Sequence, residues 1–258
     1  MASISRRRFF AHSAHKTIGV SAGLAAWECT PWMAQFAEAE TPPRPLRVCL
    51  VSGSFEYKSD ESMVALQEYL EKGYPVKCSR AFAPNEESLP GLENLEQCDC
   101  AVFFTRRLKI DGEPLERIKR YCASGRPIVG IRTASHGFQN WLAMDKEVFG
   151  GDYGNHYANK LLPQIAIAEG AKGNPILAGV EPYQSSGSLY RNPKIAADTT
   201  VLLTGTIPEH TEPVAWTRMH CGARVFYTSL GHVDDFRQAS FLRLMVNALA
   251  WATERKLS

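Results

Sequence analysis

The sequence predicts an α/β fold built on a mostly parallel sheet. Three apolar runs, at 46–52, 100–105 and 127–131, are too short for helices and rich in β-branched or aromatic residues. Segments with helical spacing, at 59–72 and 114–124, lie between these runs. Because strands and helices alternate at short intervals, the strands are expected to run parallel with right-handed crossovers.

The same patterns predict the remaining elements. A helix is expected at 236–253, and a short helical turn is expected to start at Asn174. An alternating run at 163–168 is typical of an edge strand. Further strands are expected at 76–81, 189–191, 200–205, 213–216 and 224–228, with the last two paired through a turn near 221–222.

Composition limits the classes of partner. The chain has 258 residues, a net charge of +2 and 45% hydrophobic residues, enough for one sizeable core or two small ones. So small a charge argues against nucleic acid or a membrane surface as the main partner. The chain has no run of about 20 apolar residues that could span a membrane. A homo-oligomer is left open.

The first 39 residues differ from the rest. Arg6 and Arg7, followed by apolar residues, resemble the twin-arginine export signal, and a mildly apolar stretch follows at 18–27. Ala37 and Ala39 provide a small-x-small cleavage site. We therefore expect a signal peptide at 1–39, a proline-rich linker at 40–45, a domain at 46–258, and a periplasmic or extracellular location.

The seven cysteines do not predict a metal site. None stands in Cys-x-x-Cys spacing, so a zinc knuckle is not supported. Twin-arginine substrates fold before export in a reducing compartment, so the fold is not expected to need disulfides. Cys49, Cys100 and Cys122 lie in apolar patterns typical of the core. No cysteine is predicted to be a catalytic nucleophile.

A candidate site follows the strand at 127–131. Gly130-Ile131-Arg132-Thr133-Ala134 occupies the place of a nucleophile elbow, with arginine in the nucleophile position. An arginine cannot attack a carbonyl, but it can hold an oxyanion or a hydroxyl-rich ligand. In an open α/β sheet, ligands bind at the carboxyl ends of strands. The alternative is that Thr133 or Ser135 only caps the next helix, while Arg132 pairs with a carboxylate.

Three histidines share this kind of position. His136, His156 and His232 follow strand ends or lie beside glycines, with Asp152 and Asp234 close to two of them. Two or three histidines and a carboxylate would suit zinc or another divalent metal. No local histidine pair exists, so acid–base chemistry without a metal is equally supported. No P-loop or Gly-x-Gly-x-x-Gly motif follows a strand, so nucleotide binding has no support.

Several segments in order resemble one family. They are Val129–Thr133, Gly150–Tyr157, Asn174–Leu177, Pro213–Trp216 and Gly222–His232. Together they resemble the ThuA-like family, named after a trehalose-utilisation protein, over about 46–253. The resemblance implies a flavodoxin-like, class I glutamine amidotransferase-like three-layer sandwich. It implies a role in carbohydrate metabolism, on keto sugars or glycosides. It does not imply glutaminase activity, because the amidotransferase cysteine is absent.

Family members often carry a histidine near the position of Arg132, and His136, four residues later, could take that role. The resulting hypothesis is an exported protein whose partner is a small-molecule carbohydrate. Its alternatives are a non-catalytic carbohydrate-binding module and an accessory subunit of an exported oxidoreductase system. Whether it is an enzyme, such as an isomerase, lyase or hydrolase, stays open. The expected catalytic residues are His136, His156, His232 and Asp152, with Asp152 orienting one histidine. The expected substrate-binding residues are Arg132, Thr133, Tyr153 and Asp234. If a metal is bound, its expected ligands are His136, His156 and His232.

Overall fold

The computed structural model describes residues 44–257. The predicted signal peptide, its cleavage site and most of the linker lie outside the described residues. Within the described part, no helix combines the length and the apolar character needed to cross a membrane.

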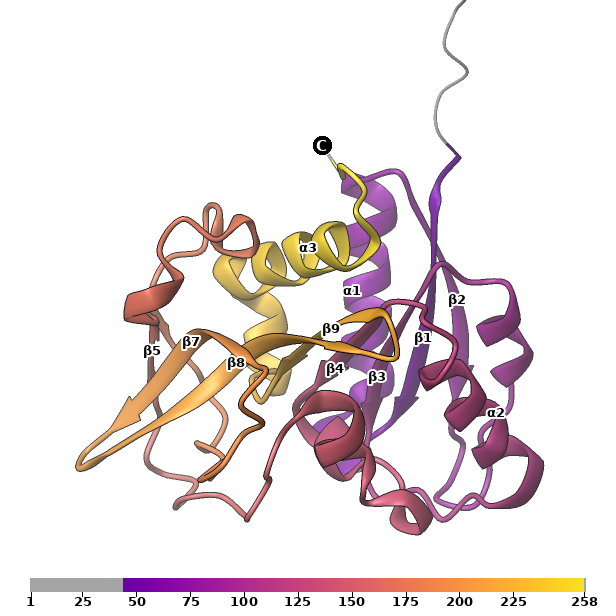
Figure 1. Cartoon of the computed structure of the whole chain (residues 1–258), viewed down its shortest axis with the longest axis horizontal. Helices are drawn as coiled ribbons and strands as arrows, with labels where there is room; N and C mark the ends of the chain where they lie inside the picture. Colours follow the sequence, from indigo (N-terminus) through magenta and orange to yellow (C-terminus); the bar gives the residue numbers. More distant parts are fainter. Residues whose placement is uncertain (1–43, 258) are drawn as a thin grey trace, which may run out of the picture. The chain divides into compact units, whose positions relative to one another are not determined.

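The described chain forms a nine-stranded sheet (Figure 1). Its order is β2-β1-β3-β4-β9-β8-β7-β5-β6. The strands from β2 to β9 in this order are parallel, and the remaining strands pair antiparallel. The bounds are β1 Leu46–Gly53, β2 Val76–Phe82, β3 Cys100–Thr105, β4 Ile128–Ile131, β5 Gln164–Ile167, β6 Tyr183–Gln184, β7 Thr200–Ile207, β8 His210–His220 and β9 Ala223–Thr228.

Three α-helices cover the parallel part, which gives a three-layer arrangement (Figure 1). Helices α1 (Ser59–Gly73) and α3 (Ala239–Thr253) pack on one face, in a hydrophobic core that includes Leu66 and Leu244. Helix α2 (Gly112–Cys122) packs on the other face, where Ile118 joins a second core. The predicted α/β sandwich is confirmed, with a sheet that is parallel from β2 to β9 and antiparallel from β9 to β6.

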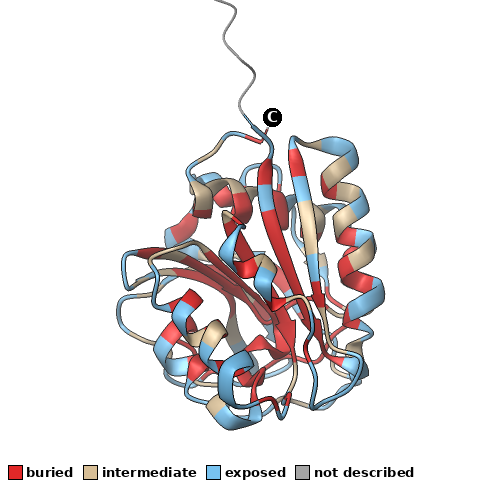
Figure 2. Cartoon of the chain, turned by 90° about the vertical axis from the view of Figure 1, so that its right-hand side faces the viewer, coloured by how far each residue is buried: buried red, intermediate tan, exposed pale blue. Residues whose placement is uncertain are grey.

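The parallel strands form because their residues are apolar on both faces. All six residues of β3 are buried, as are all residues of β1 except Arg47. Helices on both sides of a parallel sheet exclude water from both of its faces, so its strands are near-continuous apolar runs. Figure 2 shows the central strands as almost unbroken buried ribbons, with exposed residues on the outer surfaces.

Three expectations about the second half need correction. The run at 163–168 is not an edge strand, because β5 lies between β7 and the short strand β6. The expected strand at 189–191 is a single bridge between Tyr190 and His156. The last helix begins at Ala239, because Val233–Arg237 forms a separate 3-10 turn capped by the side chain of His232.

The topology brings several loops to one edge of the sheet. Strands β1, β3, β4 and β9 are neighbours that run in one direction, so their carboxyl ends share an edge. We call this the carboxyl edge, and the opposite one the amino edge. Tyr57 follows β1, Arg132 follows β4, and His232 follows β9. Ligand sites of open α/β sheets lie at such an edge.

Candidate functional site

Arg132 stands at the sharp turn after β4. Its φ is 48°, in the left-handed region that non-glycine residues rarely occupy, and only 1% of it is exposed. The hydroxyl of Tyr227 donates a hydrogen bond of 2.6 Å to the carbonyl of Arg132, which anchors the turn. The strained strand-to-helix turn of a nucleophile elbow is therefore present, and it carries a guanidinium instead of a nucleophile.

Two tyrosine rings flank the guanidinium of Arg132. Its central carbon lies 4.4 Å from the ring centroid of Tyr57 and 4.9 Å from that of Tyr190, within cation–π range. The main chain also packs closely: a Cβ on Gly187 would lie 2.5 Å from Nη1 of Arg132. Tyrosines and glycine thus hold the side chain in one position.

Only neutral groups bond the guanidinium. Nη1 donates to the carbonyl of Ser229 at 2.9 Å. Nη2 donates to the hydroxyls of Tyr57 at 3.2 Å and Ser188 at 3.4 Å. Nε has no hydrogen-bond partner, and no carboxylate forms an ion pair with Arg132, among residues 44–257. The simple alternative, in which Arg132 pairs with a carboxylate, does not hold within the described chain.

A cavity of about 280 Å³ opens beside this arginine. We call it the arginine cavity. Its lining is mostly polar and comes from five parts of the chain: the loop after β1, the turn after β4, the turn after β9, position 159 and the segment 186–188. The side chains in its lining include Glu56, Tyr57, Arg132, Asn159, Ser188 and His232.

Asp235, which the sequence did not single out, fixes His232. The Asp235 carboxylate is fully buried and accepts hydrogen bonds from the amides of Gly231 at 2.9 Å and His232 at 3.0 Å. Its Oδ2 also accepts from the hydroxyl of Ser185 at 2.9 Å. Asp234, which was expected to bind substrate, lies 3.6 Å from Nδ1 of His232 and pairs with Arg237, and it does not line the cavity.

A second, smaller cavity of about 160 Å³ contains His136. The ring of His136 stacks on Tyr153 at a centroid distance of 4.2 Å, and its Nδ1 lies 3.0 Å from the hydroxyl of Ser135. Asp145 and Arg107 also line this space, which we call the histidine cavity. Predicted residues His136 and Tyr153 therefore do meet, in a different cavity from Arg132 and His232.

Burial shifts two groups in the histidine cavity in opposite directions. It lowers the pKa of His136 to about 3, with help from the positive charges of Arg107 and Arg106. It raises the pKa of Asp145 to about 7, although a hydrogen bond from the amide of Tyr153 (2.8 Å) partly opposes the rise. At neutral pH, His136 is an uncharged base and Asp145 retains much of its proton.

The aromatic ring of Tyr190 packs against residues of both cavities. Its centroid lies 4.7 Å from that of Tyr153 and 6.2 Å from that of His136, and the guanidinium of Arg132 also lies over this ring, at 4.9 Å. Tyr190 carried no signal in the sequence, because an apolar and aromatic run reads equally well as a strand. Tyr57 did carry one, its position at the carboxyl end of β1, but the sequence does not show which loop side chain turns inward.

The other predicted residues lie elsewhere. Thr133 is fully buried, donates to Ser54 at 3.0 Å and does not line the arginine cavity. Nδ1 of His156 lies 2.7 Å from the carbonyl of Tyr157. Asp152 pairs with Lys146 at 3.2 Å, and with no histidine in the part of the chain described. The prediction that Asp152 orients a histidine gains no support.

The donor set for a metal is likewise not assembled. Residues 44–257 contain no group of three or more His, Cys, Asp or Glu side chains placed to hold an ion. His136 and His232 belong to different cavities, and the nearest group to Nδ1 of His156 is a carbonyl oxygen. The three histidines do not fit a single zinc site.

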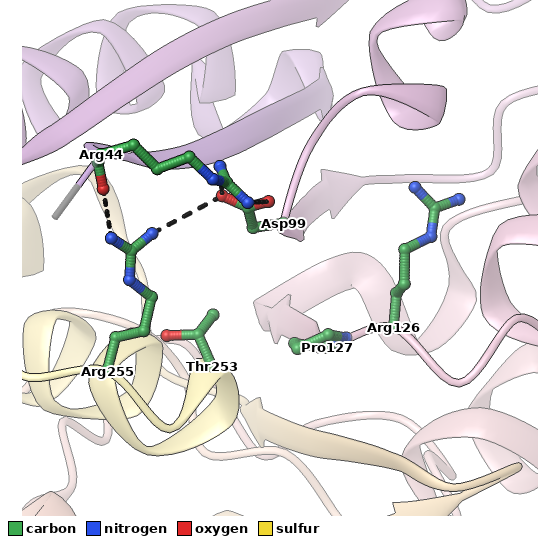
Figure 3. Close-up of a pocket in the computed structure, with 6 residues that line it drawn as sticks. All are labelled: Arg44, Asp99, Arg126, Pro127, Thr253 and Arg255. Atoms are coloured by element: carbon green, nitrogen blue, oxygen red, sulfur yellow. Dashed lines mark hydrogen bonds and ion pairs between the residues drawn. The ribbon is translucent and has the colours of Figure 1, made fainter.

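A third cavity, of about 450 Å³, lies at the amino edge (Figure 3). Arg44 donates two hydrogen bonds to Asp99, at 2.8 and 2.9 Å, and Arg255 approaches the same carboxylate at 3.7 Å. Arg255 also donates to the carbonyl of Arg44. Arg126 lies apart from this group in Figure 3. These contacts join the start of β1, the start of β3 and the end of α3 at the amino edge.

These features define the class of protein: a flavodoxin-like α/β domain with polar cavities at the carboxyl edge of a parallel sheet. The family model described as trehalose utilisation, ThuA, matches residues 47–252. The chain belongs to the ThuA family.

Solved structures support the fold. A putative ThuA-like protein from Parabacteroides merdae matches with a TM-score of 0.65 and 17% identity, over 83% of this chain and 92% of that one. A cytoplasmic protein from Salmonella typhimurium matches with a TM-score of 0.58 and 16% identity, over 80% of this chain and 99% of that one. A β-galactosidase from Bacillus circulans matches at 0.57 and 12%, over 83% of this chain and 32% of that one. No curated protein matches the chain in sequence.

Proposed function

We propose that this protein binds and transforms an oxidised sugar or glycoside in the arginine cavity. The observation that carries the proposal is the lining of that cavity. A guanidinium, the hydroxyls of Tyr57 and Ser188, the amide of Asn159 and an imidazole converge there in a mostly polar lining. Such a set suits a ligand rich in hydroxyl and carbonyl oxygens.

The proposed chemistry depends on two groups in the cavity lining, the imidazole of His232 and the guanidinium of Arg132. A keto sugar has an acidic proton on the carbon beside its carbonyl. His232 would accept that proton, and Arg132 would stabilise the negative charge that develops on the carbonyl oxygen. Return of the proton to the neighbouring carbon gives an isomer, and loss of a substituent from the next carbon gives elimination. Neither outcome needs a metal or a redox cofactor.

Hydrogen exchange tests this proposal. The full-length protein is incubated in D₂O with methyl 3-keto-α-D-glucopyranoside, and deuterium uptake beside the carbonyl is followed by NMR. We expect uptake that His232→Gln reduces by roughly 100-fold or more, the usual contribution of a general base. The control is His210→Gln, because His210 stacks on Tyr157 outside both carboxyl-edge cavities.

The possible results separate the alternatives. Binding of the keto-glycoside without exchange would favour a carbohydrate-binding module. Co-purification with an exported oxidoreductase would favour an accessory subunit. Absence of both exchange and binding would contradict the proposal.

We further propose export through the twin-arginine route, on the evidence of Arg6, Arg7 and the Ala37-x-Ala39 site. Intact-mass measurement of the periplasmic protein should give a first residue near Glu40. Replacement of Arg6 and Arg7 by lysine should stop export. Unchanged export of that variant would contradict the proposal.

A further inference from the structure

The arginine cavity presents an unbalanced positive charge. Arg132 is 1% exposed, and a guanidinium remains protonated in proteins. Its bonded partners, the carbonyl of Ser229 and the hydroxyls of Tyr57 and Ser188, are all neutral. A buried charge without a counter-charge is costly to a fold, so its retention calls for an explanation.

The carboxylates around Arg132 are committed to other donors. Asp235 contributes a favourable field, but it bonds the amides of Gly231 and His232 and the hydroxyl of Ser185. Glu56 lines the cavity, but it pairs with Arg106 at 2.9 Å. Neither forms an ion pair with Arg132 within residues 44–257.

The hydroxyls beside the guanidinium add two more donors. Tyr57 and Ser188 each accept from Nη2 of Arg132, and neither has an acceptor for its own proton in the described part of the chain. Both bonds are long, 3.2 and 3.4 Å, so an entering anion competes with weak contacts. Within residues 44–257, two hydroxyl protons without an acceptor therefore lie in the cavity lining beside a guanidinium whose own acceptors are all neutral.

We propose that the natural ligand of this cavity is a sugar acid whose carboxylate is bound by Arg132, Tyr57 and Ser188. The inference rests on the proposed function and names its substrate class: in a sugar acid the group that acidifies the neighbouring C–H is the carboxylate itself, so Arg132 still holds the oxygen on which negative charge develops. A volume of about 280 Å³ is near the lower end for small-molecule sites and suits a monosaccharide. One guanidinium with Glu56 in the same lining matches a single negative charge better than a phosphate dianion.

Calorimetric titration of the full-length protein tests the proposal. The probes are D-glucuronate and D-galacturonate, each paired with its uncharged amide of nearly equal size, and D-glucose 6-phosphate. We expect at least one acid to bind about tenfold or more tighter than its amide, the usual contribution of hydrogen bonds to a charged group. Arg132→Met should reduce that ratio to about one.

A matched control separates the site from general charge effects. Arg191 is exposed and also stacks on a tyrosine, Tyr157, outside the cavity lining, so Arg191→Met should leave the ratio unchanged. Thermal melting checks that each variant folds. If Arg132→Met does not fold, Tyr57→Phe removes one donor and keeps the ring, and it should lower the ratio several-fold.

The results also distinguish this inference from the proposed function. Equal affinity for acid and amide in both pairs, or tighter binding of glucose 6-phosphate than of either acid, would overturn the sugar-acid assignment. If the neutral keto-glycoside still undergoes exchange, the proposed function stands without this inference. If no sugar of either kind binds or reacts, both fall together.

Discussion

The two edges of the sheet use arginine in opposite ways. At the amino edge, Arg44, Arg47 and Arg255 surround Asp99, and the arginines keep contact with solvent. At the carboxyl edge, Arg132 is buried among tyrosines, and the buried carboxylate Asp235 bonds main-chain amides instead. Each of these amino-edge arginines has a carboxylate partner within the protein, while Arg132 at the carboxyl edge has none among residues 44–257.

This contrast distinguishes a structural ion-pair cluster at the amino edge from a candidate ligand site at the carboxyl edge. The amino-edge cavity is larger than either of the other two, but its arginines already have acceptors. Burial raises the pKa of Asp99, but hydrogen bonds from Arg44 and Arg47 outweigh it and hold the pKa at about 2. Cavity size therefore says less about function than unsatisfied charge does.

The largest expected effect comes from removing the two aspartates in turn. Asp235→Ala should lower the free energy of unfolding by about 3–5 kcal/mol, because it leaves buried donors without an acceptor. Asp99→Ala should cost only about 1–2 kcal/mol, because its arginine partners remain hydrated. Urea denaturation monitored by fluorescence gives both values. Equal costs would remove the distinction between the edges.

The next effect tests how tightly the main chain holds Arg132. Gly187→Ala would place a Cβ 2.5–2.8 Å from three guanidinium atoms, so we expect a loss of about 1–3 kcal/mol. Sugar-acid binding should weaken as well, because the guanidinium must shift. Gly170→Ala is the control, since a Cβ there meets nothing within 4 Å. Similar melting temperatures for the two variants would show that the guanidinium moves freely.

A smaller effect should appear in the pH dependence of stability. The pKa of Asp145 is about 7 in the folded protein against 3.8 ordinarily, so the folded state binds the proton more tightly. Stability from this group therefore falls as pH rises from about 4 to 7. His136 has the opposite effect: its pKa falls from 6.5 to about 3 on folding, so its contribution to stability is lost as pH falls from about 6.5 to 3. The stability difference between Asp145→Asn and the wild type isolates the first group.

The variant should gain stability relative to the wild type as pH rises through this window, on the order of 1 kcal/mol or more. Chemical denaturation at pH 5 and pH 8 measures the gain. A difference that does not change with pH would contradict the raised pKa of Asp145.

The smallest expected effect is at the cysteines. Cys221 is exposed in the turn before β9, at the amino edge, whereas Cys49, Cys98, Cys100 and Cys122 are buried. Brief treatment with iodoacetamide at pH 7.5 should modify Cys221 first and leave carboxyl-edge ligand binding unchanged. Peptide mass mapping identifies the modified residue. Loss of binding that is traced to one cysteine and prevented by the ligand would revive a catalytic thiol.

The parallel half of the fold was predictable because its signals are local. Buried strands such as β3 are continuous apolar runs, and α1 and α2 show their inward faces by spacing. The antiparallel half was less predictable. The two-residue strand β6 is too short for any periodicity, and its presence removes β5 from the sheet edge.

The site was predictable only in part, because its arrangement depends on contacts between residues that are far apart in the sequence. Arg132, His136 and His232 could be placed at the carboxyl edge, because parallel strands deliver their ends there. Their division between two cavities could not, because it depends on Tyr190, which is far from all three in sequence. Asp145 gave no local signal either, since its raised pKa arises mainly from burial, which its sequence neighbourhood does not reveal.

The turn after β4 has one further consequence. Its unusual backbone angle is anchored by Tyr227 through the carbonyl of residue 132, so the anchoring bond is independent of the side chain displayed there. The turn can therefore present a different side chain at position 132 to the same cavity without a change in its backbone. In an evolving lineage, one codon change at this position could exchange attack on a substrate for recognition of a charge, while the scaffold stays the same.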